Sequence, residues 1–204
     1  RRPHEETGPA RARRAGHGLM TLNGAALLVI DVQKAIDHPS WGLRNNPQAE
    51  SNIAVLLAAW RASGWPVYHI RHDSSEPQST YRPGQPGHDF KPEALPLEGE
   101  PVIAKRTNSA FIGTSLEARL CASGIATLVI VGVITNNSVE ATVRMAGNLG
   151  FSTFLVEDAA FTFGRKDWNG AWRSASEVHA MSLANLDGEY CTVTRTADVL
   201  VHLT

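Results

Sequence analysis

Short apolar runs alternate with amphipathic segments over most of the chain. The first run, AALLVIDV at residues 25–32, would place apolar side chains on both faces of a strand, which is typical of a central strand in a parallel sheet. Residues 49–62 follow a helical period, with Gly64 as the end of the helix and one apolar stripe of Ile53, Leu56, Leu57 and Trp60. These segments predict a buried strand followed by an amphipathic helix.

The same alternation continues to the C-terminus. Further strands are predicted at residues 65–72, 101–105, 127–133, 151–158 and 190–195. Further helices are predicted at residues 115–123, from about residue 137 to a stop at Gly150, and at residues 174–186. Strict alternation requires crossovers between parallel strands, which are nearly always right-handed. The chain is therefore predicted to be an α/β protein, a three-layer α/β/α sandwich with a mainly parallel, Rossmann-like sheet.

One long segment interrupts the alternation. Residues 73–100 contain five prolines and three glycines and follow neither a strand nor a helix period. Loops longer than about 12 to 15 residues usually form lids or walls of a site. We expect this loop to line a pocket or an interface.

Composition and charge fit one globular domain. The chain has 204 residues, 43% hydrophobic and 19% charged, which is enough apolar material for one core. The formal net charge of -1 gives no broad attraction to nucleic acid or to a membrane surface. Cys121 and Cys191 lie 70 positions apart with no CxxC spacing, which fits a reducing cytoplasm. We expect a cytoplasmic protein that binds a small-molecule substrate and has no nucleic-acid or membrane partner.

The first 19 residues differ from the rest. They contain five arginines and almost no large apolar side chain, and Met20 follows them. No apolar stretch comes after the basic residues, as it would in a signal peptide. We therefore expect residues 1–19 to be an N-terminal extension, either an upstream segment or an arm added for expression, and residues 20–204 to form the folded domain.

Three residues whose side chains can take part in a reaction lie at or just past the ends of strands. Asp31 ends the first strand, and Lys105 ends the strand at residues 101–105. Ser138 lies in the first turn of the helix after residues 127–133. Reactive groups of open α/β sheets collect beyond the carboxyl ends of the strands. Singly, such an Asp is more typical of a cap and such a Lys of a solvated end. Together, an acid, a cation and a hydroxyl at a helix N-terminus supply the groups needed for acyl transfer.

Three segments of this chain are DVQKAID, EPVIAKRTNSAFIGTSL and GVITNNSVEATVRMAGNLGF. They resemble the three motif blocks of the isochorismatase-like cysteine hydrolase superfamily. The resemblance runs from about Ala25 to the C-terminus, and it is specific because the blocks occur together and in order. It implies a Rossmann-like sandwich, usually oligomeric, that hydrolyses C–N amide-type bonds or the vinyl ether of isochorismate. It also implies that Asp31 is the base, Lys105 its electrostatic partner and Ser138 the nucleophile position, with a cis peptide bond between Val133 and Ile134.

Ser138 is a departure from the superfamily, which has cysteine at this position. Neither Cys121 nor Cys191 is placed to replace it, and both are predicted to be small buried hydrophobic residues. A serine hydroxyl needs a base to take its proton, and an ordinary carboxylate is a weak base for that task. Three explanations are open: a native serine, an engineered replacement of cysteine, or a scaffold that has kept binding and lost hydrolysis.

No metal site and no cofactor are predicted. Nicotinamidase-like relatives use an Asp-x-His pair and a further His, whereas this chain has Asp37 and His38 without the intervening residue. His69 and His72 are three apart on a strand, so their side chains point to opposite faces. We interpret His72 as a residue that anchors the following loop by a hydrogen bond.

Candidate substrate-binding residues flank the motif residues in sequence. They are Gln33, Trp41, Phe111, Asn137 and Trp168, because small-molecule sites combine aromatic walls with a few polar groups. Trp60 and Trp65 are interpreted as structural. Arg144 and Arg173 are candidates for binding an anionic substrate, although helix arginines are more often solvated.

The main functional hypothesis is a hydrolase of a small amide-type substrate. A catalytically silent small-molecule binding protein on the same scaffold is the second. The third is hydrolysis of the isochorismate vinyl ether by Asp31 acting as a general acid, which needs no thiol.

Oligomerisation is expected to bury part of the loop at residues 73–100. Tyr81 and Phe90 in this proline-rich segment would have little to pack on within one sandwich. Light scattering at micromolar concentration should therefore give the mass of a dimer or tetramer. A monomer under these conditions would contradict the expectation.

Overall fold

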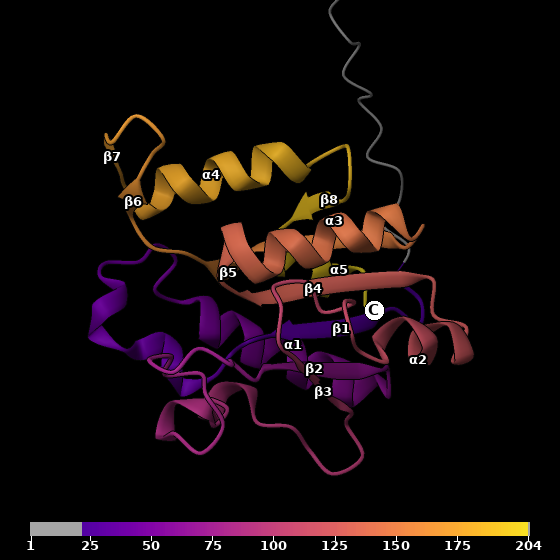
Figure 1. Cartoon of the computed structure of the whole chain (residues 1–204). Helices are drawn as coiled ribbons and strands as arrows, with labels where there is room; N and C mark the ends of the chain where they lie inside the picture. The colour runs from indigo at the N-terminus through magenta and orange to yellow at the C-terminus, as the bar shows by residue number, and fades with distance from the viewer. Residues whose placement is uncertain (1–21, 204) are drawn as a thin grey trace, which may run out of the picture.

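The computed structural model describes residues 22–203, so the arm predicted at residues 1–19 lies outside the described part. Within residues 22–203, six strands form a sheet in the order β3-β2-β1-β4-β5-β8, and all neighbouring strands are parallel (Figure 1). The strands are β1 (Ala26–Ile30), β2 (Val67–His72), β3 (Val102–Lys105), β4 (Thr127–Val133), β5 (Ser152–Phe161) and β8 (Thr192–Thr194).

Helices cover both faces of the sheet, which confirms the predicted three-layer sandwich. Successive residues of β1 alternate between two hydrophobic clusters, because neighbouring side chains of a strand point to opposite faces. One cluster receives apolar side chains from α1 (Ala49–Ser63) and α5 (Thr196–Val201). The other receives them from α2 (Leu116–Ala122), α3 (Glu140–Asn148) and α4 (Ala175–Leu186). No helix among the described residues is long and apolar enough to cross a membrane.

A small antiparallel hairpin was not among the predicted elements. It pairs β6 (Arg165–Lys166) with β7 (Trp172–Arg173) and projects from the molecule next to the start of α4 (Figure 1). Asn169 and Gly170 lie in its turn, and Gly170 has a φ of 85°. Five residues separate Lys166 from Trp172, and strand segments joined by a connection of this length that contains glycine are typical of a hairpin with a longer loop. The sequence therefore carried a signal for this hairpin.

The loop at residues 73–100 packs over its own chain. Tyr81 is buried and belongs to an apolar cluster with Ala35 and Ile36. The Phe90 ring meets the His69 ring edge-on, with 5.8 Å between centroids. Tyr81 is thus buried within its own chain and Phe90 stays partly exposed, so burial of this loop in an oligomer remains a prediction.

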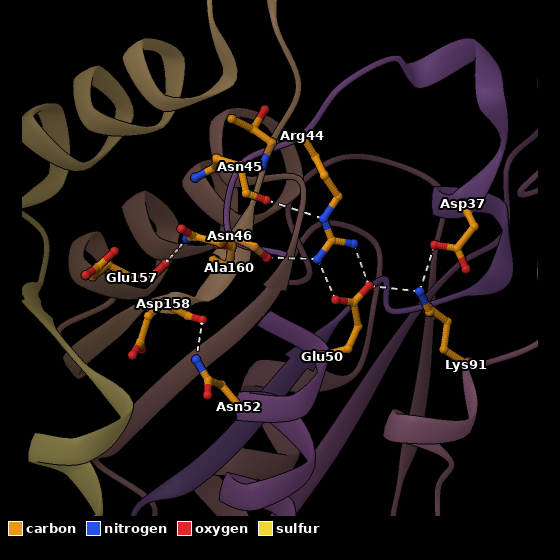
Figure 2. A network of polar contacts seen from close by, with 11 residues as sticks. Asp37, Arg44, Asn45, Asn46, Glu50, Asn52, Lys91, Glu157, Asp158 and Ala160 are labelled. Carbon is orange, nitrogen blue, oxygen red and sulfur yellow. Dashed lines mark hydrogen bonds and ion pairs between the residues drawn. The ribbon is translucent and has the colours of Figure 1, made fainter. Parts of the chain in front are cut away.

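A network of charged side chains holds the segment between β1 and α1 (Figure 2). Arg44 forms two hydrogen bonds to the Glu50 carboxylate, at 2.6 and 2.5 Å. Lys91 approaches Glu50 Oε1 at 2.8 Å and Asp37 Oδ1 at 2.7 Å. The Arg44 guanidinium also lies over the Phe161 ring, 3.4 Å from its centroid. These contacts tie the segment to the end of β5 and to the long loop.

Two asparagines extend this connection to the backbone of β5 (Figure 2). The Asn46 amide donates hydrogen bonds to the carbonyl oxygens of Glu157 and Ala160, at 2.8 and 2.7 Å. The Asn52 amide donates to the carbonyl oxygen of Asp158 at 2.7 Å. The register of β5 against β4 shifts in this part of the pair, so side chains take over hydrogen bonds that a regular ladder would make.

Glu50→Gln is expected to destabilise the fold by about 3 kcal/mol at pH 7. Its ion pairs with Arg44 and Lys91 lower the pKa of Glu50 to about 2 against the opposing effect of burial. A depressed carboxyl pKa gives stability that is present above about pH 4.5 and lost as the pH falls towards 2. Urea unfolding of both proteins at pH 7 and pH 3 should therefore show a difference that shrinks in acid.

Asp37→Asn is the matched control for this prediction. Asp37 binds the same lysine, but its side chain is half exposed, so its loss should cost under about 1 kcal/mol. Equal losses for the two variants would contradict the assigned role of Glu50.

Candidate active site

The carboxyl edge of the sheet brings Asp31, Lys105 and Ser138 together. Asp31 follows β1 directly and Lys105 is the last residue of β3. Ser138 lies in a π-helical turn, Thr135–Val139, which continues into α3. The predicted helix thus begins earlier than residue 137 and with a wider turn. The first N–H groups of such a helical run have no partner within the helix and favour negative charge.

Close approach of β1 and β4 shapes the backbone beneath the site. Asp31 has a φ of 53°, in the left-handed region that Asp and Asn tolerate better than most residues. Gly132 has a φ of 120°, and a Cβ atom there would lie 2.2 Å from the carbonyl oxygen of Ile30. Position 132 therefore accepts only glycine. The peptide bond between Val133 and Ile134, which follows, is cis.

Lys105 is the centre of the site and is only 2% exposed. Its Nζ atom lies 2.7 Å from Asp31 Oδ2 and 3.1 Å from Ser138 Oγ. The same atom lies 3.1 Å from the carbonyl oxygen of Thr107 and 3.2 Å from His72 Nδ1. Asp31 and Ser138 are buried as well. An acid, a cation and a hydroxyl thus share one site from which most water is excluded.

Burial and the charge of Lys105 shift the pKa values of Asp31 and His72. Burial raises the pKa of Asp31, and the neighbouring Lys105 only partly offsets this effect. Burial also lowers the pKa of His72, and the positive charge of Lys105 lowers it further. Asp31 Oδ1 is buried and has no hydrogen-bond partner among the described residues. The site therefore combines a carboxylate more basic than usual with a neutral imidazole.

The His72 ring lies at the site, whereas the sequence predicted only that His72 anchors the following loop. Its ring contacts Lys105 and meets the Tyr81 ring edge-on, with 5.6 Å between centroids. The expected anchoring of the loop is made by the backbone of His72, which exchanges hydrogen bonds with the Gln33 side chain. His72 ends β2, the strand between those of Asp31 and Lys105, so the strand-end rule applied to it as well.

His69 points away from this site. Its Nε2 atom lies 2.7 Å from Glu100 Oε2, and Arg61 binds the same carboxylate at 2.7 Å. The expected opposite directions of His69 and His72 are therefore observed. Among residues 22–203, no group of three or more His, Cys, Asp or Glu side chains has the geometry of a metal site.

The five predicted substrate-binding residues lie in different surroundings. Gln33 is fully buried, and its amide is bound to the backbone of His72 and His88. Phe111 packs in the core and stacks on Phe151. Gln33 has no exposed surface for a ligand, whereas Phe111 is 8% exposed, close to the 6% of Ser138.

The remaining three lie nearer the surface. Trp41 stacks on Phe163 and packs against the apolar cluster that contains Ile134. Ile134 directly precedes the turn Thr135–Val139, which carries Ser138. Asn137 is exposed and adjacent to Ser138 in sequence. Trp168 is 99% exposed on the hairpin. Trp41 and Asn137 are thus the candidates best placed to contact a substrate.

An open groove of about 1100 Å³ lies beside the site. It is lined by the hairpin, by both exposed and buried residues of α4, and by Asn136 and Glu140, and Trp168 forms part of its wall. Arg173 in this groove is paired with Asp167, and Arg144 is paired with Glu140. Neither arginine is an unpaired cation for an anionic substrate.

The two cysteines do not take part in the site. Cys191 is buried, as predicted, and burial raises the pKa of its thiol to about 12. Cys121 is exposed, so the prediction that it is buried was wrong. It lies on α2, which is only 7 residues long and buries Leu116 and Leu120 instead. Such a short helix offers too few turns for sequence to fix its buried face.

The described residues form a three-layer α/β sandwich with an acid, a lysine and a hydroxyl at the carboxyl edge of its sheet. The chain belongs to the isochorismatase family, because the family model described as the isochorismatase domain matches residues 25–198. The family resemblance predicted from the three motif blocks is therefore confirmed, and the chain is an isochorismatase-family hydrolase.

Individual relatives support this assignment. A crystal structure of an isochorismatase-family protein from Chromobacterium violaceum is 68% identical with a TM-score of 0.86, covering 88% of this chain and 93% of that one. The isochorismatase family protein YrdC of Bacillus subtilis is 43% identical over 175 residues, 86% of this chain and 94% of YrdC. Nicotinamidase 3 of Arabidopsis thaliana is 28% identical over 175 residues, 79% of this chain and 80% of that protein.

A thiol introduced by Ser138→Cys in a Cys121→Ser background should react unusually fast with iodoacetamide. At pH 7 we expect it to react at least about tenfold faster than Cys121 of the native chain, because the Lys105 ammonium and the helix start favour the thiolate. Peptide mass spectrometry gives both rates. Cys191 is the internal control and should stay unlabelled until the chain is unfolded. A thiol at position 138 no faster than Cys121 would contradict the convergence of these groups.

Proposed function

We propose that the chain hydrolyses a C–N amide-type bond of a small molecule, with Ser138 as nucleophile in a triad with Asp31 and Lys105. The observation that carries the proposal is the position of the Lys105 ammonium, within hydrogen-bond distance of both the Asp31 carboxylate and the Ser138 hydroxyl. Membership in a hydrolase family, and similarity to a protein named as a nicotinamidase, support an amide-type substrate.

Asp31 is the base of the proposed reaction. Ser138 Oγ attacks the carbonyl carbon of the amide while its proton passes to Asp31, and the carbonyl oxygen becomes an oxyanion. Burial raises the pKa of Asp31, so this carboxylate is a stronger base than an exposed one. The free Oδ1 atom is available to accept the proton, since Oδ2 is bound to Lys105.

The remaining steps use the same groups. The N–H groups at the start of the nucleophile turn and the Lys105 charge stabilise the oxyanion. When the C–N bond breaks, Asp31 returns its proton to the leaving nitrogen and the acyl group remains on Ser138. Water then attacks this ester while Asp31 takes its proton, and the acid leaves as Ser138 regains a proton. The sum is amide plus water giving acid plus amine.

His72 and Thr107 orient the lysine in this scheme. A neutral His72 accepts a hydrogen bond from Nζ of Lys105, as does the carbonyl oxygen of Thr107. With Asp31 and Ser138 they make four acceptors for the three N–H bonds of the ammonium, so at least one N–H is shared between two acceptors. The ammonium group is thus held beside Asp31 and Ser138 in one orientation.

Vinyl-ether hydrolysis is the second candidate, and the raised pKa of Asp31 favours it. A carboxyl group that keeps its proton at higher pH is suited to donate it to the terminal carbon of a vinyl ether. Water then adds to the resulting oxocarbenium carbon, and the hemiketal collapses to a ketone and an alcohol. Ser138 does not form a covalent bond on this route.

Substitutions at positions 138 and 31 distinguish the candidates. Amine release from a panel of small amides should fall by about 10³-fold or more in both Ser138→Ala and Asp31→Asn, because each removes a reacting group. Product analysis with isochorismate should lose activity in Asp31→Asn and keep it in Ser138→Ala if the vinyl-ether route operates. Binding of panel compounds without turnover by the native chain would support the silent binding protein and contradict hydrolysis.

A further inference from the structure

Helix α4 has an unusual distribution of polar and apolar side chains. Its buried residues include His179 and Ser182, whereas Ala180, Met181 and Ala184 face outward and are exposed. An ordinary surface helix places its apolar stripe towards the core and its polar residues outside. The inner face of α4 must therefore meet polar partners.

Both polar side chains of this inner face converge on Thr135. His179 Nδ1 lies 2.9 Å from the Thr135 hydroxyl oxygen. The Ser182 hydroxyl lies 3.4 Å from the Thr135 carbonyl oxygen and 2.6 Å from Glu140 Oε2. Thr135 is fully buried and begins the π-helical turn that carries Ser138. The Ser182 hydroxyl has one proton, and the nearer Glu140 carboxylate accepts it. The first residue of the turn that carries Ser138 is thus held from α4 by its side chain.

The protonation of His179 fits the role of acceptor. Burial lowers its pKa, which the Glu157 carboxylate only partly counteracts, so the ring is neutral near pH 7. Nε2 lies 3.7 Å from Glu157 Oε2, longer than an ordinary hydrogen bond. A proton on Nε2 faces this carboxylate favourably. Nδ1 is then the acceptor, and the Thr135 hydroxyl donates to it.

His179 is not arranged for maximum stability. Its Nε2 atom is buried and has no hydrogen-bond partner among the described residues. A buried polar atom without a partner destabilises the folded state relative to a satisfied one. An apolar side chain in the same space would remove this cost but would leave the buried Thr135 hydroxyl without a partner, so the ring contributes its bond to Thr135 as well as packing.

We propose that His179 is a positioning residue for the nucleophile: through its hydrogen bond to Thr135, it fixes the orientation of the turn that carries Ser138. The inference rests on the proposed role of Ser138. It assigns no contact between His179 and the substrate. A shift of about 1 Å in a reacting group costs on the order of 10²-fold in rate, so a bond that holds the turn is sufficient to affect catalysis.

Matched substitutions separate this role from packing. His179→Asn places an amide oxygen near the position of Nδ1 and can still accept from Thr135, whereas His179→Gln carries its amide past that point. Thr135→Ser keeps the hydroxyl, whereas Thr135→Val removes it at nearly constant volume. Each variant is made in the Cys121→Ser, Ser138→Cys background, and circular dichroism melts identify any variant that does not fold.

The alkylation rate of the thiol at position 138 is the first measurement. His179→Gln and Thr135→Val should slow its reaction with iodoacetamide by about tenfold or more and raise the pKa of the thiol. His179→Asn and Thr135→Ser should stay within about threefold of the parent. The double variant His179→Gln, Thr135→Val should be no slower than the worse single variant, because both remove the same bond. Equal effects of Asn and Gln at position 179 would reduce His179 to packing and overturn the proposal.

Hydrogen–deuterium exchange provides a measurement that does not depend on chemistry at position 138. The peptide spanning residues 133–140 should exchange faster in His179→Gln and Thr135→Val, and at the parent rate in the two conservative variants. Unchanged exchange in all four folded variants would overturn the positioning role even if Ser138 is the nucleophile. The converse result, altered exchange with an unreactive parent thiol, would contradict the proposed function and leave the link from α4 to the turn established.

Discussion

The ammonium group of Lys105 lies where the ends of β1, β2, β3 and β4 meet, and the chemistry of the site depends on keeping this charge out of water. A buried cation is tolerated only when acceptors surround it. Here a carboxylate, an imidazole, a hydroxyl and a carbonyl oxygen do so. The requirement to satisfy one lysine therefore places Asp31 and Ser138 side by side.

Much of the remaining structure holds these strand ends in place. Gln33 joins the end of β1 to the end of β2 and to the long loop by three hydrogen bonds. The charged network around Glu50 fastens the segment before α1 to the end of β5. Polar side chains supply these connections because regular ladders stop at the edge of the sheet, where the backbone turns away. Rigidity at the site is thus built from side chain to backbone bonds.

Sequence predicted the architecture and the three central residues because both follow from periodicity and strand ends. It did not predict the surroundings of the site. Phe111 and Gln33 flank motif residues in sequence, yet both are buried, since the direction of a side chain depends on register and helix rotation that no short pattern fixes. The direction of the His72 ring follows from the pairing of β2 with β1 and β3, which the sequence does not show. The sequence therefore predicted only that His72 anchors the loop. The hairpin at residues 165–173 was overlooked even though a five-residue connection that contains glycine joins its strands.

The left-handed backbone conformation of Asp31 limits which acidic residues this position can accommodate. Residues that adopt positive φ readily are glycine, asparagine and aspartate, and only the last of these carries a carboxyl group. Glutamate would strain the main chain before its extra methylene reached any substrate. The reach of the carboxyl group at this position is therefore limited by the backbone conformation of one residue. A carboxylate on a longer side chain would have to come from the end of a different strand.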